Sequence, residues 1–446
     1  MKNPKIQAVL LFVLVLMSRL PFLSSGFGMD PDSWNMALVA RHIAETGHYV
    51  TSRLPGYPMP ELLYAILPES YFIFNLISAV FSAVATVFFF LLLRHFRLPF
   101  PFLFALAFSF VPIIYINSVS SVDYMWAMAF ILAGNYFAVK NEFLLAGLLL
   151  GISLSCRVTS VLMFVPLLLL IPRQPLRIYL KLCLAAAAGS LLYFIPVIST
   201  YGFNFLTYYT GPDIGLRRIV SMITQELWGR VGLVFLLAAV LWQVIIWLKK
   251  PETLKADNSQ RRLLMAGGAG ISLSFLLFLY LPHEAAYLIP TVVWIMLLLP
   301  LFLRRQVLLV VIAGCLISPV VTFGHTGIYK GPVLLNMEYR EYHFRHFSTL
   351  LQKLSQVEKP VMLVAGWHEH ALKFLNKIPD SELLIVYRVE ADGKISHYHL
   401  EETITTVQEA ERKGYRIFLL EQMQDEYEVD APQPELIPLF PNHESE

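Results

Sequence analysis

The chain has 446 residues, of which 57% are hydrophobic and only 15% are charged. In soluble globular domains about a quarter of the residues are charged, so this composition excludes an ordinary soluble protein. The net charge of +2 combines a basic region before residue 330, with 22 Lys and Arg against 12 Asp and Glu, and an acidic region after it, with 12 against 20. The acidic C-terminal region argues against nucleic acid as a partner.

Eleven apolar runs predict a polytopic α-helical membrane protein, because most of them approach the length of about 20 residues that a spanning helix needs. With the N-terminus in the cytoplasm, the short inner loops hold 15 basic residues and the longer outer loops hold seven. Cytoplasmic loops are typically the basic ones, so we expect an integral protein of the cell membrane with an extracytoplasmic C-terminus. The predicted spans are 6–24, 70–93, 100–117, 121–138, 142–156, 158–172, 178–200, 231–248, 263–281, 286–303 and 306–323.

The first outer segment begins with the sequence GMDPDSW, in which two acids flank a proline. Asp30 is placed to cap a helix that starts at Pro31 and ends before Gly47. A purely structural interpretation is available, because acids at a helix start stabilise the helix by about 0.3–1 kcal/mol. The question is whether Asp30 and Asp32 also act on a ligand.

Further charged residues are expected on the same outer face. The proline-rich loop TSRLPGYPMPE carries Arg53, and Asp123 opens the fourth predicted span. Arg157 splits the apolar run 142–172 into two pieces, each shorter than a straight span needs. A single span is the competing interpretation, and it would reverse the orientation of everything downstream. Basic residues on both flanks favour two short passes, with Arg157 at an outer turn or in a re-entrant cavity.

Three stretches in this order resemble motifs of the GT-C glycosyltransferases, polytopic enzymes that include mannosyltransferases and aminoarabinose transferases. They are DSWNMALVAR at 32–41, GHYVTSRLPGYP at 47–58 and AGLLLGISLSCRVTSVLMFVPLLLL at 146–170. The resemblance implies a GT-C-like transmembrane catalytic domain over residues 1–325. It also implies a sugar donor carried on a polyprenyl phosphate, an active site on the extracytoplasmic face, and transfer to the hydroxyl of a lipid, glycan or protein acceptor.

The resemblance matches Asp32 with the family's catalytic acid, and we expect it to act as the general base. Asp30 is then a helix cap or a helper, and we expect Asp30 and Asp123 to position the acceptor or a metal. Arg157 and Arg53 are expected to bind the donor phosphate, which needs cations as it leaves. No metal ligand is assigned, although two acids spaced D-P-D leave a divalent cation such as Mg²⁺ or Mn²⁺ open.

The stretch LPHEAAYLIP, residues 281–290, is similar to another element of the family. Ala286 stands where the family often has an arginine, so other residues must complete the phosphate site. The candidates for this are His283, Arg217 and Arg218. Glu284, Tyr287 and Tyr57 are candidates for binding the acceptor or the sugar.

The segment 326–446 predicts a small extracytoplasmic α/β domain with a disordered end. Strands are expected at 359–367, 382–388 and 415–420, with helices at 368–377 and 400–413, which indicates a parallel sheet. The residues His368, Glu369 and His370 lack the histidine spacing of a zinc-binding helix.

A polytopic transporter or flippase of lipid-linked or amphipathic solutes is the alternative, and a membrane scaffold is a third. Transporters usually show paired halves and ionisable residues at the membrane midplane. Here the charges crowd the outer edge and no paired halves are visible. The sequence names neither the sugar nor the acceptor, and it does not distinguish a monomer from a dimer.

Overall fold

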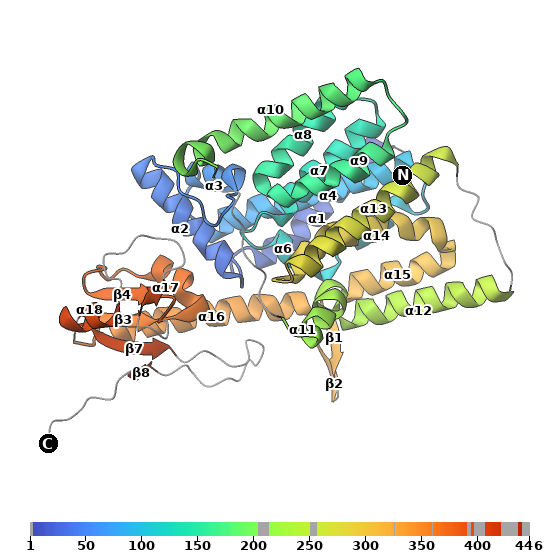
Figure 1. Cartoon of the computed structure of the whole chain (residues 1–446). Coiled ribbons are helices and arrows are strands. Elements are labelled where there is room, and N and C mark those ends of the chain that lie inside the picture. The colour runs from blue at the N-terminus through green and yellow to red at the C-terminus, as the bar shows by residue number, and fades with distance from the viewer. Residues whose placement is uncertain are drawn as a thin grey trace.

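A bundle of helices forms most of the molecule, and the C-terminal strands lie beyond one end of it (Figure 1). The computed structural model describes residues 3–203, 214–249, 257–324, 326–358, 360–389, 394–396, 406–420 and 436–438.

Six helical segments among the described residues are long and apolar enough to cross a membrane. A bent pair, with its two helices at 65° to each other, is a seventh candidate, and four shorter apolar helices accompany them. Each of the eleven predicted spans overlaps one of these segments, so the polytopic helical class is confirmed, while the number of crossings stays a prediction. The six are α1–η1 (Pro4–Phe22), α4 (Tyr71–His95), α10 (Leu176–Tyr201), α11–η4–α12 (Leu216–Lys249), α13 (Asn258–Tyr280) and η5–α14 (Ala285–Phe302). The bent pair is α5 (Pro101–Ser109) with α6 (Pro112–Ser118), and the shorter helices are α7 (Tyr124–Val139), α8 (Phe143–Cys156), η2–α9 (Val158–Leu170) and α15 (Arg305–Ile317).

The last predicted span, 306–323, is wrong at its end. The helix α15 stops at Ile317, and the chain then forms the antiparallel strands β1 (Val321–Gly324) and β2 (Gly327–Lys330). The proline at position 319 ends the helical pattern, and the β-branched residues that follow it favour a strand.

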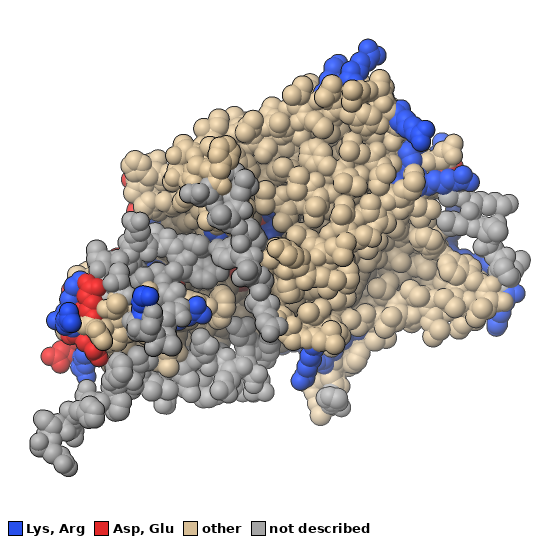
Figure 2. Space-filling view, viewed as in Figure 1, with Lys and Arg blue, Asp and Glu red and all other residues tan. Residues whose placement is uncertain are grey.

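Charge is distributed over the helical part as a membrane protein requires. Figure 2 shows a broad surface without charged side chains, and Lys and Arg gathered along its right-hand and upper edges. Figure 1 places the end of α12 and the start of α13 at the right-hand side, whereas the C-terminal strands lie at the opposite end.

The hydrogen bond from Arg94 Nη1 to Gln7 Oε1, 3.2 Å, ties the start of α1 to the end of α4.

The helix α2 (Pro31–Thr46) has the ends that the sequence predicts. The Asp30 side chain accepts a hydrogen bond from the Asp32 backbone N–H at 2.9 Å, and Gly47 ends the helix with a φ of 71°. A left-handed residue of this kind is the usual helix stop, and glycine adopts it without strain. A loop leads from α2 to the short helix α3 (Pro58–Ala65).

The C-terminal segment contains a four-stranded sheet in the order β4-β3-β7-β8. The strand β3 (Val361–Val364) runs parallel to both β4 (Leu383–Val386) and β7 (Arg416–Leu420), as predicted, and β8 (Leu436–Pro438) is antiparallel to β7. The helices are η6 (Gly366–His368), α17 (Glu369–Leu375) and α18 (Val407–Arg412), and β5 (Arg388–Val389) pairs with β6 (Ile395–Ser396). The predicted helix start at residue 400 and the predicted disordered end at 421–435 and 439–446 lie outside the described residues.

A long helix that the sequence reading did not predict, α16 (Pro332–Leu354), connects the bundle to this sheet. Its buried Arg340 donates hydrogen bonds to the backbone carbonyls of Val119, at 2.9 Å, and of Gly26. Because one guanidinium holds both loops, α16 joins the segment before α2 to the segment before α7.

Candidate active site

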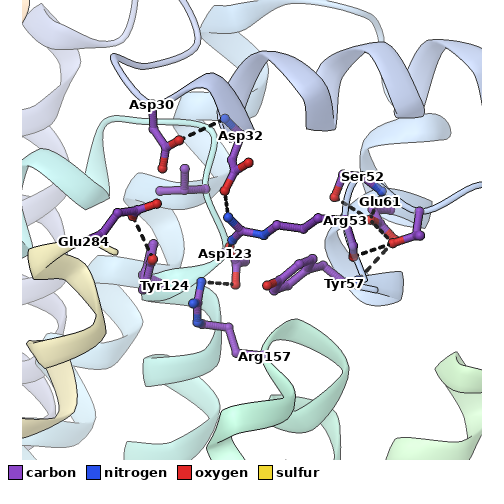
Figure 3. A network of polar contacts seen from close by, with 12 residues as sticks. Asp30, Asp32, Ser52, Arg53, Tyr57, Glu61, Asp123, Tyr124, Arg157 and Glu284 are labelled. Atoms are coloured by element: carbon purple, nitrogen blue, oxygen red, sulfur yellow. Dashed lines mark hydrogen bonds and ion pairs between the residues drawn. The ribbon is translucent and has the colours of Figure 1, made fainter. Parts of the chain in front are cut away.

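Side chains from five separate segments of the chain meet in one network of polar contacts (Figure 3). Asp30 and Asp32 come from the start of α2, and Arg53 comes from the loop before α3. Asp123 and Arg157 precede α7 and η2, and Glu284 precedes η5. The sequence predicts that five of these residues share one face, and the structure brings these five together with Glu284, which was predicted separately as an acceptor or sugar contact.

The centre of the site is a chain of alternating charges. Arg53 pairs with the Asp32 carboxylate, and its Nη2 lies 3.6 Å from Asp123 Oδ1. Arg157 Nη1 donates to Asp123 Oδ2 at 2.8 Å. Asp123 is only 1% exposed, and an unpaired buried charge costs several kcal/mol, so its two cations are what allow the carboxylate to be there.

Three tyrosines line the two cations. The Arg157 guanidinium lies 3.7 Å from the ring centre of Tyr124 and 5.0 Å from that of Tyr287. Tyr57 serves both arginines, with its ring centre 4.5 Å from the guanidinium of Arg53 and 5.7 Å from that of Arg157. Cation–π contacts fix the orientation of a guanidinium without using its N–H groups. Tyr57 and Tyr287, predicted as acceptor or sugar contacts, therefore also position the cations.

Three carboxylates form a second cluster beside these charges. Asp30, Asp32 and Glu284 each offer an oxygen within 4.8 Å of the others. The Tyr124 hydroxyl donates to Glu284 Oε2 at 2.9 Å, which joins the cluster to the Arg157 environment. Burial raises the pKa of Asp30 well above its usual value, and the neighbouring Glu284 carboxylate raises it further. Carboxylate oxygens at such spacing suit a hard divalent cation, which would relieve their repulsion.

An apolar cavity opens behind Arg157. About 450 Å³ of space, part of it open to solvent, lies between its lining side chains. Arg157, Tyr124, Tyr287, Thr159 and Ser160 supply polar groups, and the rest of the lining is mainly apolar. The apolar lining is Ala127, Met128, Ile131, Leu162, Met163, Leu277, Ala286, Ile289 and Pro290, with the Ser274 side chain among them. A cation beside an apolar cavity could bind a molecule that has an anionic head group and a hydrocarbon chain.

Sequence reasoning missed Glu61, which is fully buried on α3. Its carboxylate accepts hydrogen bonds from the Ser52 backbone N–H at 2.7 Å, from the Ser52 hydroxyl at 2.6 Å and from the Tyr49 hydroxyl. These bonds fix the loop that carries Arg53. The sequence PMPELL places this acid between prolines and an apolar run. An acid in such a place is expected to be buried, and a buried acid needs hydrogen-bond partners, so the sequence did carry a signal for it.

The remaining predicted phosphate ligands lie less centrally. His283 packs against Tyr287 with 6.5 Å between ring centres, and burial lowers its pKa. Arg217 and Arg218 lie on α11 (Leu216–Ser221), where Arg218 Nη1 pairs with Glu226 at 2.5 Å. Arg218 therefore pairs within its own helical segment, and its role in phosphate binding stays a prediction.

The chain resembles known structures in its fold. No protein-family model and no curated protein sequence matches it. The crystal structure of ArnT from Cupriavidus metallidurans bound to undecaprenyl phosphate matches with a TM-score of 0.54 and 14% identity over 86% of both chains. ArnT in the apo state matches with a TM-score of 0.51, 14% identity and the same coverage. These matches show that the chain shares the fold of ArnT, so the GT-C-like fold that the sequence resemblance implies is confirmed.

Proposed function

We propose that this protein is a membrane glycosyltransferase that moves a hexose or pentose from a polyprenyl phosphate to an acceptor hydroxyl on the extracytoplasmic face. The observation that carries the proposal is the position of Arg157. Its guanidinium faces the carboxylate site and also lines the apolar cavity. One residue thus stands where the phosphate of a lipid donor and the hydroxyl of an acceptor would meet.

The donor lipid fits the cavity by its chemistry. A prenyl chain would lie among the apolar side chains, and its phosphate would reach Arg157, with Arg53 as the second cation. Charge-assisted hydrogen bonds from a guanidinium to a phosphate are about twice as strong as neutral ones. The undecaprenyl phosphate bound in the ArnT crystal structure supports this choice of lipid.

Asp32 is the proposed general base. A hydroxyl is a weak nucleophile at neutral pH, so a carboxylate must accept its proton as the new bond forms. The acceptor oxygen then bonds to the anomeric carbon, and the bond from that carbon to the phosphate oxygen breaks. The electron pair leaves with the phosphate, whose charge the arginines balance. A single base beside a phosphate site favours one displacement over a two-carboxylate glycosidase design.

The ion pair between Arg53 and Asp32 would couple donor binding to the activation of the base. A phosphate that draws the Arg53 guanidinium toward itself releases the Asp32 carboxylate for the acceptor proton. Asp123 would hold both arginines in place throughout. It would act as a positioning group more than as an acceptor contact.

Asp30, Asp32 and Glu284 would hold a divalent cation if one is used, with Mg²⁺ or Mn²⁺ suited to three oxygen ligands. The cation would balance negative charge near the leaving phosphate. Asp30 and Glu284 would otherwise hold acceptor or sugar hydroxyl groups.

The proposal includes residues 1–325 as the transmembrane catalytic domain in the cell membrane, with a cytoplasmic N-terminus, and residues 326–446 as an extracytoplasmic α/β domain. The basic edge of the bundle in Figure 2, opposite the sheet, supports this orientation.

The test is sugar transfer by the purified protein with a panel of polyprenyl-phosphate hexoses and pentoses, in Mg²⁺, in Mn²⁺ and in chelator. We expect Asp32→Asn to fold but to lose about 10²-fold or more of the rate at which polyprenyl phosphate is released. The matched control is Asp257→Asn, because Asp257 caps α13 at the other end of the bundle.

If wild type and Asp32→Asn turn over a donor equally, the assignment of the base is wrong. If neither turns over any donor while liposomes containing the protein move lipid-linked sugars across the membrane, the transporter alternative replaces the enzyme.

A further inference from the structure

The proposed base follows a segment that has no regular secondary structure. Residues 23–30 lead from η1 to the start of α2, which carries Asp32, and they contain no helix or strand. Such a segment takes its position from hydrogen bonds with other parts of the chain. Its backbone carbonyls make these bonds, with donors on α4, in the segment before α7 and on α16.

Asn75 on α4 holds two of these carbonyls. Its side chain is fully buried, and its Nδ2 donates to the carbonyl of Leu23 at 2.9 Å and to that of Gly26 at 2.8 Å. The Asn75 Oδ1 accepts a hydrogen bond from the Ser121 hydroxyl at 2.7 Å. Because Ser121 belongs to the segment before α7, one side-chain amide joins the two segments that lead to the acids of the site.

The two segments also contact each other directly. The Ser121 backbone N–H donates to the Phe27 carbonyl at 2.7 Å. A Cβ added at Gly28 would lie 3.3 Å from the Ser120 Cβ, so the two backbones are closely packed. One of these segments leads to the proposed base and the other leads to Asp123. The distance between the two acids therefore depends on this junction.

Arg340 reaches the junction from α16, in the C-terminal segment. It is 3% exposed, and its guanidinium donates to the Val119 carbonyl, at 2.9 Å, and to the Gly26 carbonyl. Burial lowers the pKa of Arg340 to about 10, which leaves the group charged at neutral pH. Both partners are neutral carbonyl oxygens, and a cation held in this way is costly to bury. The planar fork of N–H groups is what lets one side chain bridge two carbonyls.

The donor side of the site is fixed independently of this bridge. Asp123 directly precedes α7, and its carbonyl accepts a hydrogen bond from the Ala127 N–H of that helix at 3.0 Å. The cavity lining comes from Arg157 and from α7, η2, α13 and η5–α14. Loss of Arg340 should therefore move Asp32 relative to the arginines and leave the phosphate end of the site in place.

We infer that Arg340 is a positioning residue, which holds the proposed base, Asp32, at a fixed distance from Asp123 and its two arginines. The inference rests on the proposed function and extends it to a residue outside the bundle. It gives the C-terminal segment a part in the transfer step, because α16 carries the guanidinium from this segment to the bundle (Figure 1).

The experiment combines three measurements on the full-length protein in nanodiscs. They are kcat and donor KM for sugar transfer, the Kd for free polyprenyl phosphate, and hydrogen–deuterium exchange of the backbone amides in residues 23–30 and 118–123. We expect Arg340→Met, which keeps the stem and removes the donors, to lower kcat about tenfold or more, because a misplacement of about 1 Å can cost 10²-fold. The donor KM and the lipid Kd should stay within about twofold of the wild type, with faster exchange in both segments.

Arg340→Lys keeps the charge but offers no fork, so it should restore part of kcat. It also carries the test if Arg340→Met does not fold. The matched control is Arg345→Gln, because Arg345 is exposed on the same helix and its Nε donates to the Glu341 carbonyl of that helix at 3.4 Å. This control should behave as the wild type in all three measurements.

The outcomes separate this inference from the proposed function. If Arg340→Met transfers sugar at the wild-type rate, or loses kcat and lipid binding together, Arg340 does not position the base. If no protein transfers sugar, the proposed function fails, and the exchange data then decide. Faster exchange in Arg340→Met but not in Arg345→Gln still supports the fixed distance between the two segments, and unchanged exchange overturns it.

Discussion

Arg53 lies between Asp32 and Asp123, so in the proposed mechanism this one residue would couple donor binding to the release of the base. A guanidinium has five donors, so it can keep Asp123 while it exchanges Asp32 for a phosphate. Lysine offers one point charge and no such fork, which is why arginine suits this position. The sequence predicts Arg53 as a phosphate ligand, and the structure adds its ion pair with the proposed base, Asp32.

Asp30 should make stability depend on pH. Its pKa is raised above the ordinary value of 3.8 because the carboxyl is partly removed from water and faces Glu284. The folded state therefore holds this proton more tightly than the unfolded state. Stability should then fall as pH rises from about 4 through the raised pKa. We expect Asp30→Asn to remove part of this fall, measured as the melting temperature against pH in detergent.

Asp257→Asn is the control for this measurement, because Asp257 also caps a helix through its side chain. If the wild type and Asp30→Asn lose stability in parallel over the whole pH range, Asp30 does not hold its proton as described.

The elements that the sequence predicts best are those with local chemical signals. The ends of α2 follow from Asp30, Pro31 and Gly47, and the break at Arg157 follows from one charge in an apolar run. The hairpin β1–β2 and the helix α16 were not predicted. The hairpin lies where a long apolar pattern overlaps a β-branched stretch, and α16 is only weakly apolar, so hydropathy marks neither of them.

Close packing between α8 and α10 sets the position of Arg157. A Cβ added at Gly151 would lie 2.1 Å from the Ala186 carbonyl oxygen, and one at Gly147 would lie 2.3 Å from that of Leu182. Small residues are what allow membrane helices to approach this closely. Because α8 ends at Cys156, displacing it moves the next residue, which is Arg157.

Gly151→Ala should therefore destabilise the protein by about 1–3 kcal/mol through overpacking. Gly268→Ala is the control, because a Cβ there meets nothing within 4 Å, and alanine is the better helix former. The melting temperatures of both variants in detergent test this, and we also expect weaker polyprenyl-phosphate binding by Gly151→Ala. Equal melting temperatures would show that the two helices can separate at no cost.

At the scale of the whole molecule, contacts between distant segments build the site. The Tyr124 hydroxyl reaches Glu284 across 160 positions in the chain, and Arg340 reaches the Gly26 carbonyl across 314. The sequence could place Asp30, Asp32, Asp123, Arg53 and Arg157 on one face from topology and charge. It could not predict which pairs touch, or that α17 docks on α2, because such pairings depend on packing between elements with no local signal.

Phe374→Ala should loosen the C-terminal segment from the bundle, because it removes the ring that lies against Phe27 and Trp34. We expect faster limited proteolysis of the region after α16 and a higher KM for acceptor, with the KM for donor unchanged. The control is Phe72→Ala, which removes a partly exposed ring at the start of α4. A rise in the donor KM alone would contradict this prediction.

The central claim is that Arg157 holds the phosphate of a polyprenyl lipid, and binding of free polyprenyl phosphate to the protein in nanodiscs tests it most directly. This lipid is the product for every donor sugar, so the measurement requires no knowledge of the sugar. We expect saturable binding that weakens about tenfold or more in Arg157→Gln, because a charge-assisted hydrogen bond is lost. Arg157→Gln combined with Asp123→Asn should show the same loss without leaving a buried charge.

The control is Arg262→Gln, because Arg262 lies on α13 and donates to the Leu170 carbonyl at 3.1 Å. Its binding should equal that of the wild type. If all of these proteins bind the lipid equally, or if the wild type does not bind it, Arg157 is not a phosphate ligand and the account fails.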